Sequence, residues 1–537
     1  MDPNPADLLL TGGAVHTVSS GIAEAVAVRG GRITAVGSAS DLATTAGATT
    51  RVVELEGRTI LSGFQDAHVH PPHGGLLAIE CNLHEAKTAE ECLDAIARYA
   101  AEHPEREWIA GSGWSMDSFP GGTPDKESLD AIVPDRPVFV TNRDGHGAWV
   151  NSRALELASI DSSPSDPPDG RIERGPGGEP SGTLHEGAMR AVQELVPATT
   201  AAEWEQAILN AQAQLHALGI TAWQDATVLP HTLSAYRTLA ERGELTMRAE
   251  GNLLWDRTRG EEQIDELLAM REQGSLGRLR IRGAKIFQDG VLENFTGALL
   301  EPYVDTDNRG IGMHEPDELS SIVTLLDGHG FQVHLHTIGD RAVRESLDAI
   351  EAARKANGRR DARHHLAHIQ LVHPDDQPRF AELAVVANAQ PYWAATSRYV
   401  TDLTLPFIGE ERASYHYPFG SLHRAGARLA FGSDWTVSTP NPLEIVEVAV
   451  TRVEHPNRDT QPMLPDEALD LETAVAASTR GSAYVNFLED ETGSIEPGKF
   501  ADLVVLDRDL FDPGAGPVGD ARVLLTLVEG EVVFDAL

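Results

Sequence analysis

The sequence predicts an α/β protein: a (β/α)8 TIM barrel with a small β-sandwich domain assembled from both chain ends. Three observations support this fold class. Strand-like apolar runs alternate with helical stretches through the middle of the chain, as repeated βα units require. Short alternating runs separated by glycine turns occupy both ends. The length of 537 residues accommodates a barrel of typical size and an appended unit.

The two ends of the chain have the pattern of one β unit. Near the N-terminus, alternating runs flank the pair Gly30–Gly31, which is a good signal for a hairpin. Because chain termini often lie close together, we predict that residues 1–62 and 487–537 form one β-sandwich domain. Its expected strands are Leu8–Leu10, Ala25–Val28, Ile33–Val36, Arg51–Leu55, Thr59–Leu61, Ala501–Asp507, Val523–Val528 and Val532–Phe534.

Residues 63–486 contain as many strand candidates as a closed barrel needs. The eight predicted strands are Gly63–His70, Ile220–Asp225, Met247–Leu254, Ile281–Asp289, Gln332–His336, His364–Ile369, Val385–Gln390 and Leu429–Asp434. The helical stretches that separate several of them are Ala201–Leu218, Glu261–Gln273, Asp317–His329 and Arg341–Ala356.

One connection is too long for a βα unit. We interpret residues 71–219 as an insertion that covers the barrel mouth. Within it, Pro137–Thr141 is expected to be a strand. The span Ser162–Pro180 is rich in Pro, Gly and Asp, which predicts an exposed loop or hairpin.

Composition excludes several classes of function. The formal net charge of −39 would repel phosphate backbones and anionic lipids, so neither a nucleic-acid partner nor a membrane-surface role is expected. The two cysteines, Cys81 and Cys92, form neither a disulfide framework nor a CxxC metal site. The N-terminal residues lack a signal-peptide pattern, and no apolar run reaches the roughly 20 residues that span a bilayer. The default expectation is a soluble cytoplasmic protein.

Histidines end the first predicted barrel strand. His68 and His70 are two residues apart, so strand alternation places both imidazoles on one face, about 6–7 Å apart. Two imidazoles that project together can chelate one divalent cation. A lone His-x-His pair is weak evidence in a chain with 21 histidines, so the pair gains weight only from the rest of the barrel mouth.

Further candidate ligands end other strands, where barrel enzymes carry their catalytic groups. The fifth strand offers His334 and His336 on one face. The sixth offers His364, His365 and His368, of which alternation places His364 with His368. The candidates on the fourth and eighth strands are Lys285 and Asp434.

Lys285 lies among Ala284, Ile286 and Phe287. Burying a charged lysine there would be costly, so its amine should be neutral or modified. A neutral amine can take up CO2 and become a carbamate, a two-oxygen anion able to bridge two cations. The simpler alternative is an unmodified lysine paired with Asp289.

Together these residues resemble the amidohydrolase superfamily. Short sequence motifs elsewhere in the chain narrow the resemblance to the YtcJ-like branch of that superfamily. This branch, the amidohydrolase 3 group, includes N-substituted formamide deformylases. The sequence motifs on which the resemblance rests are Asp66–His70 (DAHVH), Gly111–Trp114 (GSGW), Gly145–Ser152 (GHGAWVNS), Lys285–Gly290 (KIFQDG), Leu335–Ala342 (LHTIGDRA), Gly432–Trp435 (GSDW) and Gly493–Leu503 (GSIEPGKFADL).

The resemblance implies a ligand set of one or two divalent metals, with Zn2+ the first candidate. His68, His70 and Asp434 would hold one metal. A carboxylated Lys285 would bridge it to a second metal held by His336 and His368. The position of each histidine within the family's sequence motifs favours His336 over His334 and His368 over His364 as ligands. A metal-activated hydroxide would be the nucleophile, and Asp434 would carry its proton to the leaving group.

Five residues are candidates for contact with a small-molecule substrate: His146, Trp114, Glu293, Asn294 and Tyr392. The resemblance places a histidine such as His146 near the active site. For the others, packing in the core is the competing interpretation.

The predicted function is a metal-dependent hydrolase of carbon–nitrogen bonds other than peptide bonds, acting on an amide such as an N-substituted formamide or N-acyl compound. The first alternative keeps the metal site but hydrolyses an ester, lactone or cyclic amide. A further alternative is a non-catalytic binding module on the same fold. The family also suggests a homodimer.

Overall fold

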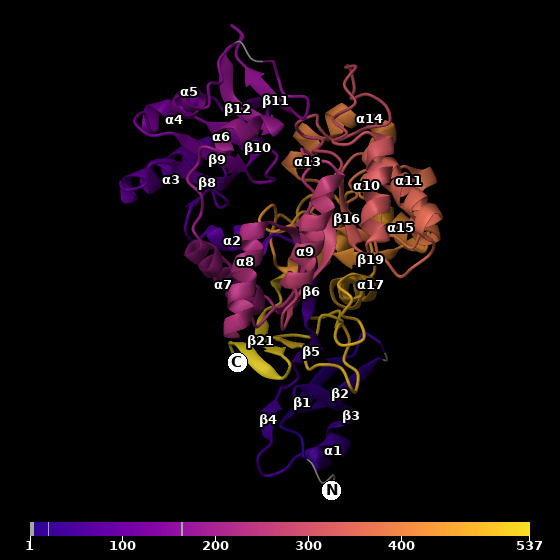
Figure 1. Ribbon diagram of the computed structural model, residues 1–537. Helices are drawn as coiled ribbons and strands as arrows, with labels where there is room; N and C mark the ends of the chain where they lie inside the picture. Colours follow the sequence, from indigo (N-terminus) through magenta and orange to yellow (C-terminus); the bar gives the residue numbers. More distant parts are fainter. Residues whose placement is uncertain (1–4, 20, 163–164) are drawn as a thin grey trace.

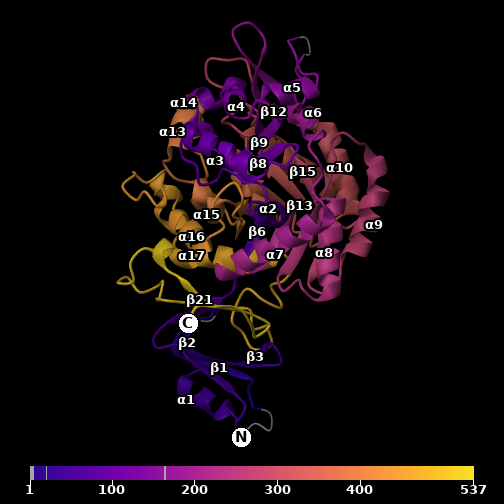
Figure 2. The same cartoon turned by 90° about the vertical axis from the view of Figure 1, so that its left-hand side faces the viewer.

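The computed structural model describes residues 5–19, 21–162 and 165–537. Three parts are stacked along the molecule (Figure 1). A sheet that contains strands from both chain ends lies at one end, a barrel lies in the middle, and an inserted α/β layer lies over the opposite end of the barrel (Figure 2).

The barrel has the eight parallel strands that the sequence predicts, in the predicted order, so the predicted fold class is confirmed. The strands are β6 (Phe64–Val69), β13 (Ile220–Val228), β14 (Arg248–Leu254), β15 (Leu279–Phe287), β16 (Gln332–Thr337), β17 (His365–His368), β18 (Val386–Ala389) and β19 (Arg428–Phe431). The ring is completed after β19, where the Asp434 backbone N–H donates to the carbonyl oxygen of His68 at 2.8 Å.

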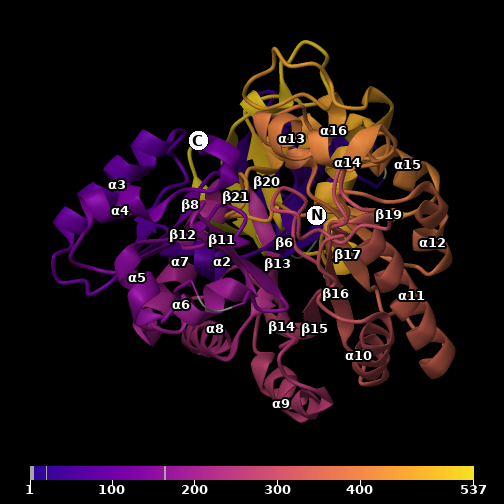
Figure 3. The same cartoon turned by 90° about the horizontal axis from the view of Figure 1, so that it is seen from above.

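Helices cover the outside of the barrel (Figure 3). They are α7 (Ala201–Ala217), α8 (Pro230–Arg242), α9 (Ile264–Gly274), α10 (Pro316–Gly328), α11 (Asp340–Asn357), α12 (Gln377–Glu382), α15 (Phe419–Arg424), α16 (Pro442–Thr451) and α17 (Leu471–Ala476). These helices cover the outer faces of the barrel strands. Because the strands are buried on both faces, their sequences are nearly continuous apolar runs. A further short helix, α18 (Ser482–Val485), packs instead against interior residues of the barrel, among them Ala67, Val386 and Ala430.

Helix α7 shows how local sequence defines these elements. A capping box between Thr200 and Glu203 starts it, so two backbone N–H groups that would otherwise lack partners are satisfied. Trp204, Ile208 and Leu215 then pack into the barrel core at helical spacing. The helix therefore packs with the barrel, whereas the sequence prediction assigns residues 71–219 to the insertion.

Both chain ends contribute to the small sheet, as predicted. Its strand order is β22-β21-β20-β5-β1-β2-β3, and β4 also pairs with β1. The strands are β1 (Leu8–His16), β2 (Ile22–Arg29), β3 (Arg32–Gly37), β4 (Arg51–Glu54), β5 (Thr59–Ser62), β20 (Leu503–Leu506), β21 (Val523–Val528) and β22 (Glu531–Asp535). A short helix, α1 (Ala39–Leu42), follows β3.

This sheet curls upon itself. The Ile33 N–H donates to the Lys499 carbonyl at 2.8 Å, and the Ala501 N–H donates to Gly31 at 2.9 Å. The apolar faces therefore enclose one core, which includes Leu10, Val26 and Leu503 among others. The predicted sandwich is thus one continuous hydrogen-bonded sheet folded around its core.

The insertion contains a six-stranded sheet with the order β11-β12-β10-β9-β8-β7. Its elements are β7 (Cys81–Asn82), α3 (Ala89–Glu102), β8 (Ile109–Trp114), α4 (Lys126–Ile132), β9 (Val138–Asn142), β10 (Gly147–Val150), α5 (Ser152–Leu157), β11 (Gly170–Arg174), β12 (Pro180–Glu186) and α6 (Arg190–Gln193). Residues 170–186 form the hairpin expected for the span Ser162–Pro180, of which residues 163 and 164 lie outside the described residues.

Three shorter helices border the barrel mouth: α2 (Pro71–Leu76), α13 (Arg398–Leu403) and α14 (Leu405–Ala413). In the part of the chain that the structure describes, none of the helices combines the length and the apolar character needed to cross a membrane.

A buried ion-pair network joins the barrel to the small sheet. Arg248 at the start of β14 donates to Asp502 at 2.7 Å and to Glu529 at 2.8 Å, and Arg278 donates to Glu529 at 2.8 Å. The side chains of Arg248 and Asp502 are 8% and 1% exposed. Both charges are therefore removed from water and depend on each other.

Replacing Arg248 with alanine should destabilise the protein by about 3–5 kcal/mol, because Asp502 would stay buried without its cation. The measurement is the melting temperature. The control is Arg242→Ala, which removes an exposed partner of Glu205 and should cost no more than about 1 kcal/mol. Equal melting temperatures for the two variants would contradict this account.

Candidate functional site

Asp434 lies between His68 of β6 and His70, the residue that follows this strand. Its Oδ1 atom is 3.2 Å from His68 Nε2 and 3.1 Å from His70 Nε2. Asp66 fixes this arrangement, because its Oδ1 accepts hydrogen bonds from the backbone N–H groups of His68 and Ser433. The first and last barrel strands are thereby held together at the point where the site forms.

His368 joins this group, but not in the way that strand alternation predicts. The prediction that His364 and His368 share a face is wrong. His365 lies inside the barrel with its ring 4.0 Å from that of His334, whereas His364 contacts Asp327 of the outer helix α10 at 3.1 Å. The backbone turns at His368, where φ is 72°, so the side chain swings into the mouth. Positive φ in a non-glycine residue is strained and is often found at functional sites.

The two histidines of β16 have different surroundings. The Nε2 atom of His334 is 2.9 Å from His68 Nδ1, so His334 lies behind His68 in the barrel interior. The ring of His336 is 4.5 Å from that of His368 and faces the mouth. Its Nδ1 atom is 3.2 Å from Asp289, which leaves Nε2 directed to the site.

Lys285 is buried beside these residues, 1% exposed, with Nζ 4.9 Å from the centroid of the Phe287 ring. Burial lowers the pKa of its amine to about 7. Asp289 is not its partner, because the carboxylate accepts the backbone N–H groups of Ala298, Ile338 and Gly339. The simple Lys285–Asp289 pair is therefore not formed.

The electrostatics of the cluster favour ligation. Burial lowers the pKa of His68 to about 3 and holds the pKa values of His336 and His368 well below their usual range, so the imidazoles are neutral at pH 7. Burial raises the pKa of Asp434, but the adjacent His68 and His70 outweigh it and hold this pKa well below its usual range. Neutral imidazoles and an ionised carboxylate are the forms that bind metal.

A divalent cation fits this donor set. One ligand atom from each of His68, His368 and Asp434 lies within 4.8 Å of the other two. The Nδ1 atom of His368 is buried without a hydrogen-bond partner, which a cation would satisfy. Imidazole nitrogens with a carboxylate oxygen suit zinc and related ions. His70, His336 and Lys285 lie around this group.

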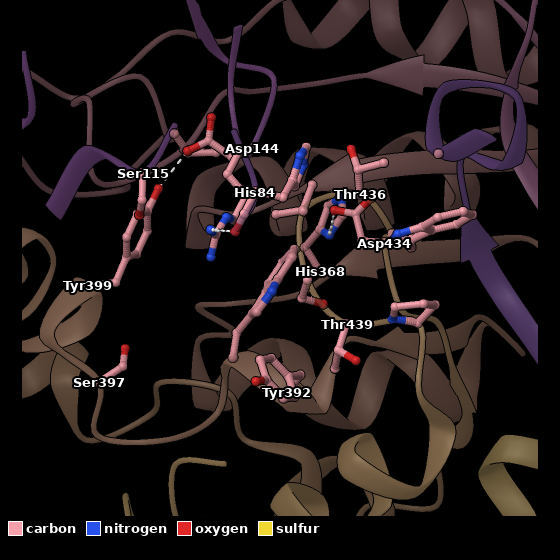
Figure 4. Close-up of a pocket in the computed structure, with 18 of the residues that line it drawn as sticks. His84, Ser115, Asp144, His368, Tyr392, Ser397, Tyr399, Asp434, Thr436 and Thr439 are labelled. Atoms are coloured by element: carbon pink, nitrogen blue, oxygen red, sulfur yellow. Dashed lines mark hydrogen bonds and ion pairs between the residues drawn. The ribbon is translucent and has the colours of Figure 1, made fainter. Parts of the chain in front are cut away.

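The cluster opens into a cavity of about 890 Å3 between the barrel and the insertion. In Figure 4, Asp144 and Tyr399 lie on one side of it and His368 and Asp434 on the other. Trp393 forms part of the wall and stacks on His368 with ring centroids 5.4 Å apart. A small organic molecule fits a cavity of this size and mixed character.

Three of the five predicted substrate contacts line this cavity: His146, Glu293 and Tyr392. Glu293 accepts a hydrogen bond from Thr404 at 2.6 Å, and burial raises its pKa. The Tyr392 hydroxyl donates to the His455 carbonyl at 3.0 Å. The ring of His146 lies 5.2 Å from that of His336, centroid to centroid.

The other two, Trp114 and Asn294, are not among the residues that line this cavity. Trp114 is 0% exposed, donates from Nε1 to the Val140 carbonyl, and packs in the core of the insertion. Asn294 is also buried. Its side chain donates to the His146 carbonyl and accepts from the Thr296 backbone, so it supports the loop instead.

Sequence reasoning missed two acidic residues that organise the cavity. Glu186 contacts His146 at 2.9 Å, and Asp144 accepts from the Tyr399 hydroxyl at 2.5 Å. Asp144 immediately precedes the Gly145–Ser152 word, which was a usable signal. Glu186 ends a hairpin strand 40 residues after His146, and no motif connects the two.

Comparisons with known proteins identify the family of this chain. The profile of the Amidohydrolase family matches residues 51–534. Protein LONG AFTER FAR-RED 3 of Arabidopsis thaliana is 33% identical, with 98% of this chain and 92% of that protein covered. The putative amidohydrolase YtcJ of Bacillus subtilis is 28% identical, and the N-substituted formamide deformylase of Arthrobacter pascens is 27% identical. Each of these alignments covers 98% of both chains.

Solved structures are similar over the same extent. A crystal structure of an uncharacterized metal-dependent hydrolase from Pyrococcus furiosus is 28% identical with a TM-score of 0.71, and the match covers 94% of this chain and 99% of that chain.

Gly432 is the residue whose small size allows β19 to approach β6. A Cβ atom there would lie 2.5 Å from His68 Cβ and 2.7 Å from the His68 backbone nitrogen. We expect Gly432→Ala to lower stability by about 1–3 kcal/mol, because a barrel strand must shift. Thermal denaturation measures this.

The control is Gly328→Ala at the exposed end of α10, where an added Cβ would meet only ordinary contacts at 3.4 Å. If Gly432→Ala melts at the temperature of this control, the close approach of the two strands is not a real constraint.

Proposed function

Because the chain belongs to the amidohydrolase family, we propose that it is a metal-dependent hydrolase that cleaves the C–N bond of an amide, such as an N-substituted formamide or N-acyl compound. The family match and the relatives confirm the resemblance that the sequence motifs indicate. The observation that carries the proposal is the buried group of His68, His368 and Asp434 at the floor of the cavity.

Asp434 with His68 and His70 would hold one cation, and His336, His368 and a carboxylated Lys285 would hold a second. When bound, such a cation supplies Lewis acidity: it polarises a carbonyl group and makes water acidic enough to ionise near pH ~7. The three-residue group is sufficient for one cation. The neutral amine expected for Lys285, given its low pKa, is the form that reacts with CO2.

The chain's own groups would handle the proton. In amide hydrolysis the oxygen of water adds to the carbonyl carbon, the C–N bond breaks, and a proton goes to the leaving nitrogen. Asp434 is ionised and faces the cavity, so it can accept the proton from water and deliver it to that nitrogen. The products are a carboxylic acid and an amine.

The amide substrate class rests on two supports. A relative aligned over 98% of both chains is named an N-substituted formamide deformylase. The cavity combines the stacked His368 and Trp393 rings with polar groups, which suits an amide that carries an apolar substituent. An ester, lactone or cyclic amide would use the same site, and the assay that tests amides can include them.

Metal content measured by elemental analysis tests the site. We expect one to two equivalents of zinc or a similar ion per wild-type chain, and loss of that metal together with amide hydrolysis in His68→Ala and His368→Ala. His364→Ala is the matched control, because the His364 side chain lies on the outer side of the barrel and contacts Asp327 of α10.

Two results would count against the proposal. Retention of the metal by both His68→Ala and His368→Ala would remove the ligand assignment. A metal-loaded wild-type protein that hydrolyses no amide, from formanilide to N-acyl amines, would remove the substrate class. Activity on lactones alone would favour the alternative.

The state of Lys285 distinguishes a site for two metal ions from a site for one. If it is carboxylated, loading with zinc and bicarbonate should raise the metal content from about one equivalent to about two, and Lys285→Met should stay near one. A content of one equivalent in both proteins would show that no carbamate bridge forms.

A further inference from the structure

Glu293 is a buried carboxylate in the cavity wall. It lies in the loop after β15 and is 7% exposed, and it lines the cavity. The Thr404 hydroxyl at 2.6 Å and the Gln370 side-chain amide at 3.3 Å both donate to its Oε1 atom. In the described part of the chain, no donor reaches Oε2 and no cationic side chain pairs with this carboxylate. The Oε2 atom can therefore meet a ligand in the cavity.

Asp144 is a second carboxylate that lines the cavity. Its Oδ2 accepts a hydrogen bond from the Tyr399 hydroxyl at 2.5 Å, which Figure 4 shows, and its Oδ1 accepts from the His146 backbone N–H at 2.9 Å. Both donors are neutral. Among the residues that the structure describes, Asp144 forms no ion pair, so its negative charge also remains available to a ligand.

Helix α13 holds both carboxylates on one wall. Tyr399 lies in the first turn of this helix, and Thr404 directly follows its last residue. One hydroxyl group donates to Asp144 and the other to Glu293. In Figure 4, Asp144 and Tyr399 lie across the cavity from Asp434. The acidic wall and the candidate metal ligands therefore face the same space from different sides.

The charge of this wall is not offset by the protein. Burial and the nearby second carboxylate both raise the pKa of Glu293, which shows that its charge is costly. Two arginines line the cavity, but each contacts another group: Arg143 donates to the His84 carbonyl at 2.6 Å, and Arg398 lies 3.5 Å from Asp402. A cation that bound to the wall would stabilise both carboxylates.

Aromatic rings extend the same wall. Tyr399 and Tyr417 line the cavity, and the Tyr417 backbone N–H donates to the carbonyl of Gln370, whose side chain holds Glu293. The negative face of an aromatic ring attracts an ammonium group. Carboxylates and aromatic rings together are therefore suited to a positively charged ligand.

We propose that Glu293 and Asp144 select amides whose substituent ends in an alkylammonium group, which binds to these carboxylates while the amide carbonyl lies at the candidate metal site. The inference deepens the proposed function and rests on it, since it names the substrate class of the same site. The apolar stem between the amide and the ammonium lies along the rings of the cavity. Both residues determine specificity and lie away from the reacting atoms.

The kinetic test compares two amides of equal size. N-(ω-aminobutyl)formamide carries an ammonium group where N-pentylformamide carries a methyl group, and homologues with shorter and longer stems are included. We expect kcat/KM of the wild type to be about 10- to 100-fold higher for the best charged amide than for its neutral counterpart, as a hydrogen bond to a charged group predicts.

Glu293→Gln keeps the size of the side chain and removes its charge. We expect this variant to lose about 10- to 100-fold in kcat/KM on the charged amide, mainly through KM, because the contact is equal in the ground state and the transition state. On the neutral amide it should stay within about 3-fold of wild type. Asp144→Asn should shift the same ratio in the same direction, and it keeps the test valid if Glu293→Gln does not fold.

Calorimetry gives a second readout that needs no hydrolysis. Alkylammonium chlorides of the same stem lengths should bind to wild type more tightly than the corresponding alcohols, and their Kd should rise about 10- to 100-fold in Glu293→Gln. Glu467→Gln is the matched control. Glu467 is also a largely buried carboxylate, 12% exposed, that accepts from a hydroxyl group, that of Ser421 at 2.6 Å, and it does not line the cavity. It should behave as wild type.

Equal kcat/KM for charged and neutral amides, together with no binding of alkylammonium ions, would overturn the inference and leave the proposed function standing. A preference that persists in both Glu293→Gln and Asp144→Asn would also overturn it. A preference for N-formylaminobutanoate would overturn it in favour of an anionic group bound by Arg143. Alkylammonium binding that depends on Glu293, in a metal-loaded protein that hydrolyses no amide, would overturn the proposed function and leave the cation site standing.

Discussion

The hydrogen bond from the Asp434 backbone to the His68 carbonyl, at 2.8 Å, is the contact on which the site depends. It joins the end of the last barrel strand to the first one, and it brings a carboxylate against two imidazoles that are far away in sequence. Asp66 strengthens the same junction between the two strands, because its carboxylate accepts hydrogen bonds from the backbone N–H groups of His68 and Ser433. Closing the barrel and assembling the cluster are therefore one structural event.

Burial gives these residues their chemistry. Imidazoles removed from water stay neutral, a lysine amine loses much of its preference for the charged form, and one carboxylate stays ionised because histidines surround it. The cost of desolvating so many polar groups is tolerable only if they are paired or bound to a cation. Binding of a divalent cation by these imidazole and carboxylate groups would therefore offset the cost of burying them.

Much of the fold could be predicted from the sequence, because strands covered on both faces leave long apolar runs. The ends of those runs also located His68, Lys285, His336 and Asp434. Alternation failed at His368, since a single residue with positive φ reverses the direction of its side chain. The choice of His368 over His364 came from motif register and not from periodicity.

The insertion was the least predictable part. Trp114 belongs to a recognisable word but fills the core of the inserted sheet, and sequence does not separate a wall residue from a core residue. The contact of Glu186 with His146 depends on a hairpin that folds back across 40 residues, and such pairing carries no local signal. The eight barrel strands, by contrast, each carry their own pattern.

The pairing of β5 with β20 has a consequence for the order of events during synthesis. Ser62 lies opposite Leu503, so the middle of the small sheet cannot form until nearly the whole chain has left the ribosome. At roughly 5–20 residues per second, strands made first wait about 20–90 s for their partners. During that time β5 has an unpaired edge next to the nascent barrel, which is the kind of surface that chaperones cover.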